Sequence, residues 1–181
     1  ESCGMIGSVS TDDGIECYES TNTTPEAPEI WRHIANCHTS GRQSMVMEVS
    51  SQALKYQRVE NLPFDVACFL NIGRDHISPI EHPTFEDYFE SKLRIFDQAK
   101  TAVVNLGTEE VDRVLDFLFY LIWRDEEMRI VLREVANAEQ AVELAGLLVA
   151  MDEAEFAEAQ RQVTVAVLLG VVDEHAARAV H

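Results

Sequence analysis

The stretch SMVMEVSS at residues 44–51 decides the fold class of this chain. It begins as a short apolar run of Met and Val and ends in serines, which is typical of a buried strand in a parallel sheet. Residues 66–71 and 101–106 are apolar runs of the same kind. Helical patterns separate the three runs, and this alternation predicts an α/β layered sheet. Polar residues at the carboxyl ends of such strands predict a ligand site along that edge.

The residues before this stretch predict a hairpin and a helix. Apolar residues at 6–10 and 15–18 flank the turn sequence Asp12-Asp13-Gly14, which is typical of two antiparallel strands. Thr24 precedes Pro25, which predicts an N-cap followed by proline at the first helical position. The helix then runs through Ile30, Ile34 and Cys37 to Ser40-Gly41. A second helix is predicted to begin at the N-cap Thr84 and to carry Phe85, Tyr88, Phe89, Leu93 and Phe96.

The composition changes near residue 105. All lysines, prolines and cysteines lie at or before Lys100, and Ala, Val, Leu and Glu dominate the rest. We therefore expect residues 1–110 to form the α/β part, a parallel sheet with flanking helices, and residues 111–181 to form an acidic, mainly helical segment. Residues 163–172 fit either a buried strand or a core helix. Helical spacing of apolar residues recurs over 111–122, 128–135 and 144–151.

Charge and composition restrict the partners. The formal net charge of −18 argues against nucleic acid and against an anionic membrane, because both would repel this surface. The four cysteines have no Cys-x-x-Cys spacing, so we expect free thiols and a cytoplasmic location. No run approaches the ~20 apolar residues of a membrane span. The chain starts at Glu1 without a signal-like segment, and we expect it to be part of a longer or processed protein.

Six short motifs stand out in the first 110 residues. They are NTTPE at 22–26, MEVSSQAL at 47–54, RV at 58–59, FDV at 64–66, NIGRDH at 71–76 and YFESK at 88–92. In this order and spacing they resemble the central, ATP-binding domain of the Mur ligases. Among these, the chain is most similar to the tripeptide synthetases, which add the third amino acid to the peptidoglycan precursor. The resemblance covers residues 4–110 and implies the parallel sheet of that domain.

The resemblance implies an ATP-dependent peptide ligase. In such a ligase ATP phosphorylates the terminal carboxylate of a UDP-N-acetylmuramoyl peptide, and an amino acid amine then displaces phosphate from the acyl phosphate. Cations and well-placed polar groups stabilise the negative charge that develops during this reaction. The resemblance implies that Glu48, His76 and Lys92 bind Mg2+, with His76 and a carbamylated Lys92 in catalytic roles. Carbon dioxide adds only to a neutral amine, and the carbamate that forms is an anion.

The same resemblance implies the substrate contacts. Asn71 would lie near the nucleotide, and Arg58 is the natural charge partner for a phosphate or carboxylate. The residues that it implies for binding the UDP-N-acetylmuramoyl peptide are Thr23, Thr24, Ser50, Gln52 and Arg58.

Each assignment also has a structural alternative. Glu48 at a strand end is equally suited to capping a neighbouring loop, and His76 to a turn. Lys92 at a helical position is commonly a solvated surface lysine. The hydroxyls at Thr23, Thr24, Ser50 and Ser51 also suit helix caps.

Two family motifs are missing from the 181 residues. Neither the phosphate loop, Gly-x-x-Gly-Lys followed by Thr or Ser, nor the Asp-Asn-Pro-Arg signature occurs. Two functions therefore stay open: a partial ATP-dependent ligase, and a non-catalytic scaffold or interaction module, fused or engineered, that keeps the Mur-like sheet. The partners we expect are the UDP-N-acetylmuramoyl peptide, ATP and Mg2+. A homo-oligomer through an exposed sheet edge or the helical segment is a further expectation.

Overall fold

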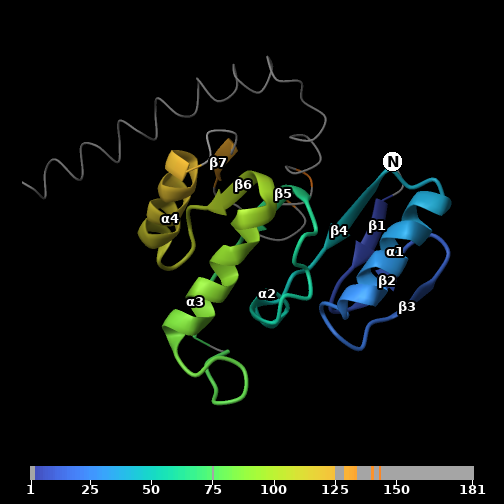
Figure 1. Cartoon of the computed structure of the whole chain (residues 1–181), viewed down its shortest axis with the longest axis horizontal. Coiled ribbons are helices and arrows are strands. Elements are labelled where there is room, and N and C mark those ends of the chain that lie inside the picture. Colours follow the sequence, from blue (N-terminus) through green and yellow to red (C-terminus); the bar gives the residue numbers. More distant parts are fainter. Residues whose placement is uncertain (1–2, 75, 125–128, 134–139, 141–142, 144–181) are drawn as a thin grey trace, which may run out of the picture.

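The computed structural model describes residues 3–74, 76–124, 129–133, 140 and 143 (Figure 1). The strands of this part form two sheets with helices packed against them, which confirms the predicted α/β fold class. The segments 144–151 and 163–172 lie outside the described residues. No helix in the described part is long and apolar enough to cross a membrane.

Sheet A contains the N-terminal strands and has the order β3-β2-β1-β4. Its strands are β1 (Cys3–Ile6), β2 (Ser10–Asp12), β3 (Cys17–Glu19) and β4 (Ser44–Met47). β1 and β4 are parallel, whereas β2 pairs antiparallel with both β1 and β3. The hairpin predicted around Asp12-Asp13-Gly14 is therefore confirmed, although its first strand begins at Ser10 rather than at residue 6.

Helix α1 (Ala27–Thr39) lies across one face of sheet A (Figure 1). It begins later than predicted, because Glu26 and not Thr24 is the N-cap. Thr24 Oγ1 instead accepts the backbone N–H of Ser50 at 2.9 Å and donates to the carbonyl oxygen of Glu48 at 2.9 Å, so it does not cap the helix. The predicted end is confirmed: the helix stops at Ser40, and Gly41 takes a φ of +79°, which glycine adopts without strain.

Sheet B is fully parallel and has the order β5-β6-β7. Its strands are β5 (Phe64–Phe69), β6 (Ala99–Asn105) and β7 (Arg129–Arg133). The helix predicted over 128–135 is wrong, because residues 129–133 pair with β6. Three consecutive apolar residues, Ile130 to Leu132, fit a strand buried against β6 better than one face of a helix. Sheet B thus extends past residue 110, and the proposed two-domain division at that point stays a prediction.

Three further α-helices complete the described part: α2 (Ser51–Lys55), α3 (Phe85–Leu93) and α4 (Val111–Arg124). The predicted N-cap Thr84 is confirmed, since its hydroxyl accepts the backbone N–H of Asp87 at 3.1 Å. A 3-10 helix, η1 (Arg94–Gln98), continues from α3. The helix predicted over 111–122 is α4, which buries Val114, Leu118 and Leu121 on one face.

Two hydrophobic cores result. The sheet B core lies between β5, β6, α3, η1 and α4, and the α1–α2 core gathers Ile30, Leu54, Val59 and Leu62. Ile95 packs against both cores. In the described part β4 ends sheet A and β5 ends sheet B, so each strand has one edge without a strand partner.

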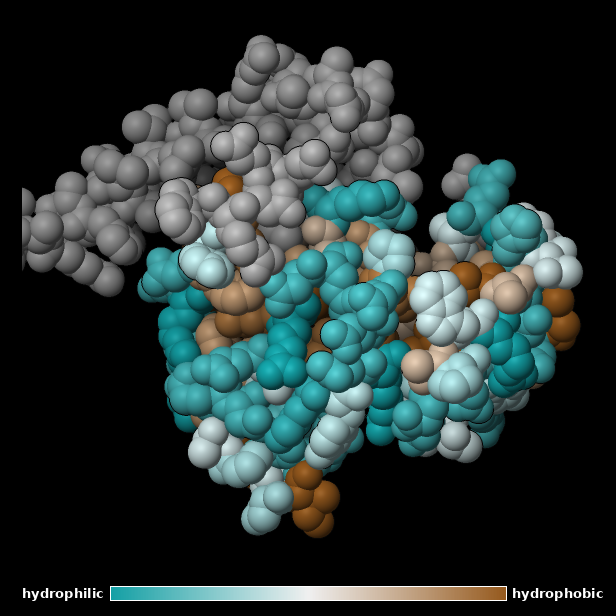
Figure 2. Space-filling view, viewed as in Figure 1, coloured by the Kyte–Doolittle hydropathy of each residue, from teal (hydrophilic) through white to brown (hydrophobic). Residues whose placement is uncertain are grey.

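The face of the molecule seen in Figure 2 is mostly hydrophilic over the described residues. The most exposed large apolar side chains, Val9 and Ile80, lie singly in loops. None of the four cysteines forms a disulfide, as predicted, and burial raises the pKa of the Cys68 thiol to about 11.

Candidate functional site

One set of predicted substrate residues comes together at the carboxyl end of β4. Ser50 caps α2: its hydroxyl accepts the backbone N–H of Ala53 at 3.2 Å, and its own N–H donates to Thr24 Oγ1 at 2.9 Å. Arg58 donates from Nη1 to the carbonyl oxygen of Thr24 at 3.3 Å, and its Nε lies 3.0 Å from the Glu26 carboxylate. Thr24, Ser50 and Arg58 thus form one polar cluster, called the Thr24 group below.

Thr23 and Gln52 adjoin the Thr24 group in the chain. Thr23 is half-buried in the loop before α1, and Gln52 is the half-buried second residue of α2. Their contacts with a substrate stay a prediction.

A second set of predicted residues surrounds the ring of Tyr88 at the carboxyl end of β5. The His76 ring centroid lies 5.4 Å from that of Tyr88, and Lys92 Nζ lies 5.2 Å from the same centroid. Lys92 Nζ also donates to the carbonyl oxygen of Asn71 at 2.9 Å. His76 Nδ1 lies 3.4 Å from the Glu81 carboxylate. The structure thus brings Asn71, His76 and Lys92 together in what is called the Tyr88 group below.

Glu48 follows β4 and directs its carboxylate to the loop after β1. The backbone N–H of Ser8 donates to Glu48 Oε2 at 2.7 Å, and a Cβ at Gly7 would lie 3.3 Å from Glu48 Cδ. This is the loop-capping arrangement, the alternative to metal binding. Gly7 leaves the space that the carboxylate occupies.

One group of three acidic or histidine donors in the described part of the chain lies within reach of a single ion, and it contains neither Glu48 nor His76. Asp75, which precedes His76, lies outside the described residues. Mg2+ binding by Glu48, His76 and Lys92 therefore stays a prediction.

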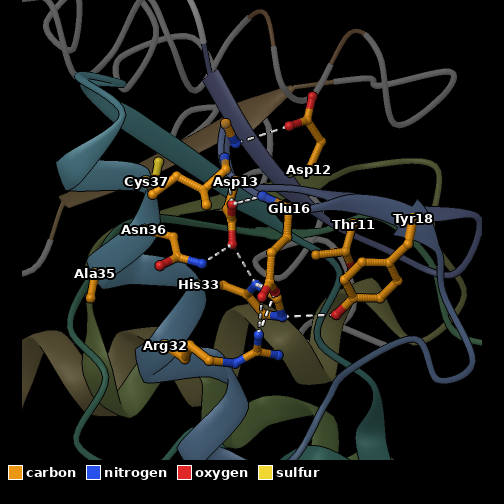
Figure 3. A network of polar contacts seen from close by, with 12 residues as sticks. Thr11, Asp12, Asp13, Glu16, Tyr18, Arg32, His33, Ala35, Asn36 and Cys37 are labelled. Atoms are coloured by element: carbon orange, nitrogen blue, oxygen red, sulfur yellow. Dashed lines mark hydrogen bonds and ion pairs between the residues drawn. The ribbon is translucent and has the colours of Figure 1, made fainter.

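Asp13 is the centre of a buried polar network, although its sequence pattern predicts only a turn (Figure 3). Its Oδ2 lies 2.7 Å from His33 Nδ1 and accepts from Asn36 Nδ2 at 2.9 Å. Its Oδ1 accepts two backbone N–H groups of the turn, at 2.9 and 2.7 Å. The other ring nitrogen of His33 lies 2.9 Å from the hydroxyl oxygen of Tyr18. The network joins the β2–β3 hairpin to α1.

This network includes the three-donor group mentioned above. Asp13, Glu16 and His33 place one ligand atom each within 4.8 Å of one another. However, Glu16 is paired with Arg32, and both Asp13 oxygens already accept hydrogen bonds. Because the guanidinium of Arg32 already neutralises Glu16, these residues are better suited to holding the hairpin against α1 than to binding a metal ion.

The Asp13 network makes stability depend on pH. Burial alone would raise the pKa of Asp13, but hydrogen bonds from the backbone of Glu16, from His33 and from Asn36 outweigh it and hold that pKa far below its ordinary value. A depressed folded pKa gives stability that is complete above the unfolded pKa of about 3.9 and is lost as the pH falls towards the folded value. We expect the free energy of unfolding, from urea titrations, to fall between about pH 4 and pH 2.

The Asp13→Asn variant is the control for this pH dependence, since it has nearly the same shape but no carboxylate. Its free energy of unfolding should change less over the same pH range. Equal slopes for the variant and the wild type would show that other groups cause the acid sensitivity.

His82 is a buried residue that sequence reasoning did not select. It is fully buried and lies two residues before the N-cap Thr84. A lone histidine before a cap carries no spacing signal, so only the fold reveals its partners, Ser51 and Asp87.

Known proteins are similar in sequence to a large part of this chain. A family model described as the Mur ligase middle domain matches residues 1–120. The UDP-N-acetylmuramoyl-L-alanyl-D-glutamate--L-lysine ligase of Streptococcus pyogenes serotype M4 (strain MGAS10750) is 45% identical over 104 residues, which are 58% of this chain and 22% of that protein. The enzyme of the same name from Streptococcus suis (strain 05ZYH33) is 44% identical over 111 residues, 61% of this chain and 23% of that protein.

The chain spans less than a quarter of the length of these curated relatives. A solved structure of a UDP-N-acetylmuramoyl-L-alanyl-D-glutamate--2,6-diaminopimelate ligase matches with a TM-score of 0.60 and 22% identity, over 75% of this chain and 27% of that one. This likeness shows a shared fold. The family match also extends to residue 120, into α4 and beyond the end of the resemblance at residue 110. Since that match takes in more than half of the sequence, the chain belongs to the Mur ligase family, through the middle domain of these enzymes.

Proposed function

We propose that this chain is the substrate-binding part of an ATP-dependent peptide ligase of peptidoglycan precursor synthesis, acting on a UDP-N-acetylmuramoyl peptide. The observation that carries the proposal is the Thr24 group, which collects hydroxyls and a guanidinium at the carboxyl end of β4. The names of the streptococcal relatives give UDP-N-acetylmuramoyl-L-alanyl-D-glutamate and L-lysine as the molecules that those enzymes join, which supports the same substrate class here.

Arg58 would bind an anionic group of the substrate. A guanidinium donates two parallel hydrogen bonds to a phosphate or a carboxylate. Its present partner, the Glu26 carboxylate, has a side chain that is 62% exposed, so the pair is a weak surface interaction that a substrate anion can displace. Thr23, Thr24, Ser50 and Gln52 would supply hydrogen bonds to the neutral parts of the substrate.

Lys92 would act from the Tyr88 group. Its neutral amine would attack the carbon of carbon dioxide and release one proton to water, which would leave a carbamate anion. Its Nζ donates to the carbonyl oxygen of Asn71, and His76 lies against the same Tyr88 ring, so both would share this end of the site. ATP belongs to this proposal as the phosphate donor. Because the 181 residues contain no phosphate loop, binding of the UDP substrate is a sharper test than turnover.

The test is the effect of Arg58→Ala on affinity. We expect calorimetry to show submillimolar binding of UDP-N-acetylmuramoyl dipeptide by the wild type. The variant should bind about ten to a hundred times more weakly, because a charge-assisted hydrogen-bonded pair is lost. The control is Lys100→Ala, which also removes one positive charge but lies on β6 near its amino end, away from the proposed site.

Two results would decide against the proposal. One is equal weakening by both substitutions, which would indicate a general charge effect. The other is no heat with the dipeptide, alone or together with Mg2+ and an ATP analogue, which would leave the non-catalytic scaffold as the function.

A further inference from the structure

His82 joins α2 to α3 through two hydrogen bonds. Its Nε2 lies 2.9 Å from Ser51 Oγ, and its Nδ1 lies 2.7 Å from Asp87 Oδ2. Ser51 is the first residue of α2, and Asp87 lies in the first turn of α3. One fully buried ring therefore holds the amino ends of both helices.

The partners determine which ring nitrogen carries the proton. The hydrogen bond from Lys55 lowers the pKa of Asp87 more than burial raises it, and the hydrogen bond from His82 lowers it further. Asp87 is therefore an ionised carboxylate, which only accepts, so His82 Nδ1 donates to it. In a neutral imidazole Nε2 then accepts the hydroxyl proton of Ser51. With the ring in that neutral form, the hydrogen bonds run from Ser51 through His82 to Asp87.

The last residue of α2 is bound to the same carboxylate. Lys55 Nζ lies 2.6 Å from Asp87 Oδ2 and donates to the carbonyl oxygen of Glu81 at 2.9 Å. A helix as short as α2 is not stable by itself in water. Its position therefore depends on contacts such as these at its two ends.

His82 also lies between the two groups of predicted site residues. Ser51 follows Ser50, which belongs to the Thr24 group, and the backbone N–H of Arg58 donates to the carbonyl oxygen of Ala53 in α2 at 2.8 Å. On the other side, the ring centroid of Tyr88 lies 5.1 Å from that of His82. A shift of α2 relative to α3 would therefore move the Thr24 group away from the Tyr88 group.

The order serine, histidine, aspartate also occurs in hydrolases, where it activates the serine as a nucleophile. Two observations argue against that role here. Ser51 is only 6% exposed, and Lys55 shares the Asp87 oxygen that His82 uses. A hydroxyl that is buried and hydrogen-bonded to His82 is suited to holding the structure.

We propose that His82 is a positioning residue that holds α2 against α3 and so sets the spacing between the Thr24 group and the Tyr88 group. The inference rests on the proposed function, in which the Thr24 group binds the substrate. Loss of either hydrogen bond should loosen α2 without unfolding the rest of the chain.

The experiment compares His82→Asn and His82→Gln in the full chain. The asparagine amide reaches Asp87 but not Ser51, and the glutamine amide extends towards Ser51. The controls are the same substitutions at His38, which is exposed on α1. Amide hydrogen exchange then reports on Leu54, Tyr56 and Arg58, whose N–H groups bond to α2 or its cap. We expect these amides to exchange about ten times faster in both His82 variants, while amides of α1 and β6 keep their rates.

Affinity for UDP-N-acetylmuramoyl dipeptide is the second measurement, and it should fall about tenfold in the His82 variants but not in the His38 variants. Exchange of the α2 amides within about twofold of wild type in both His82 variants would overturn the proposal. Equal acceleration across α1, α2 and β6 would also overturn it, because the effect would then be on global stability. A wild type that does not bind the dipeptide refutes the proposed function, whereas the exchange rates still decide whether His82 fixes α2.

Discussion

Replacement of Asp13 by alanine should lower the free energy of unfolding by about 3–5 kcal/mol, because it leaves several buried hydrogen-bond donors without an acceptor. Asp13 and His33 are both fully buried. The substitution removes the acceptor of His33, of Asn36 and of two backbone N–H groups at once. Urea titration at neutral pH, followed by circular dichroism, measures the loss.

The matched control is Asp65→Ala, which removes one carboxylate and changes the net charge equally. Asp65 is exposed on β5 and pairs with Lys100 at 2.7 Å. An exposed ion pair of this kind contributes about 0–1 kcal/mol. A loss at Asp13 no larger than the loss at Asp65 would mean that the buried network does not stabilise the hairpin.

Replacement of Phe96 by alanine should also lower the free energy of unfolding by about 3–5 kcal/mol, because it leaves a cavity in the sheet B core. Phe96 lies in η1 and is fully buried. Its ring stacks on Phe69 of β5 with a centroid distance of 6.1 Å. The lost contacts therefore lie between η1 and the sheet. Urea titration again gives the free energy of unfolding.

Phe119→Ala is the control for the Phe96 substitution. Phe119 lies on α4 and is 49% exposed, so the same truncation removes less buried surface. We expect a loss of less than about 1 kcal/mol. If the two phenylalanine variants lose equal stability, Phe96 is not the anchor of the sheet B core that its burial indicates.

Local sequence patterns were sufficient for the parallel strands and several helix ends. Residues 44–49, 66–71 and 101–106 each overlap an observed strand, β4, β5 and β6, because continuous apolar runs favour strands of a parallel sheet. The predicted burial holds best for β6, with four consecutive buried residues, and is wrong for β4, in which no residue is buried. The N-cap Thr84 is a local signal, and it is correct. The prediction of a cap at Thr24 was wrong because its Oγ1 accepts the backbone N–H of Ser50, a residue 26 positions away. The prediction of a helix over residues 128–135, where the structure has β7, was wrong for a similar reason. The partner strand β6 is distant in the sequence.

The candidate site, too, could be predicted only in part from the sequence. The order of the motifs was enough to name Thr24, Ser50 and Arg58, and the structure brings them together. The buried pairs Asp13–His33 and Ser51–His82 lie 20 and 31 positions apart, and neither repeats with a period. A single polar residue whose partner is remote leaves no pattern in the sequence, so these two networks become visible only in the fold.

The place of Ile95 has a consequence for how the chain responds to heat. Its side chain is shared by the two cores, while the strands of sheet A and sheet B form no common ladder in the described part. Cooperativity between the halves therefore depends on side-chain contacts such as this one rather than on a continuous backbone network. A smaller residue at this position would weaken that link, and one melting transition would tend to separate into two.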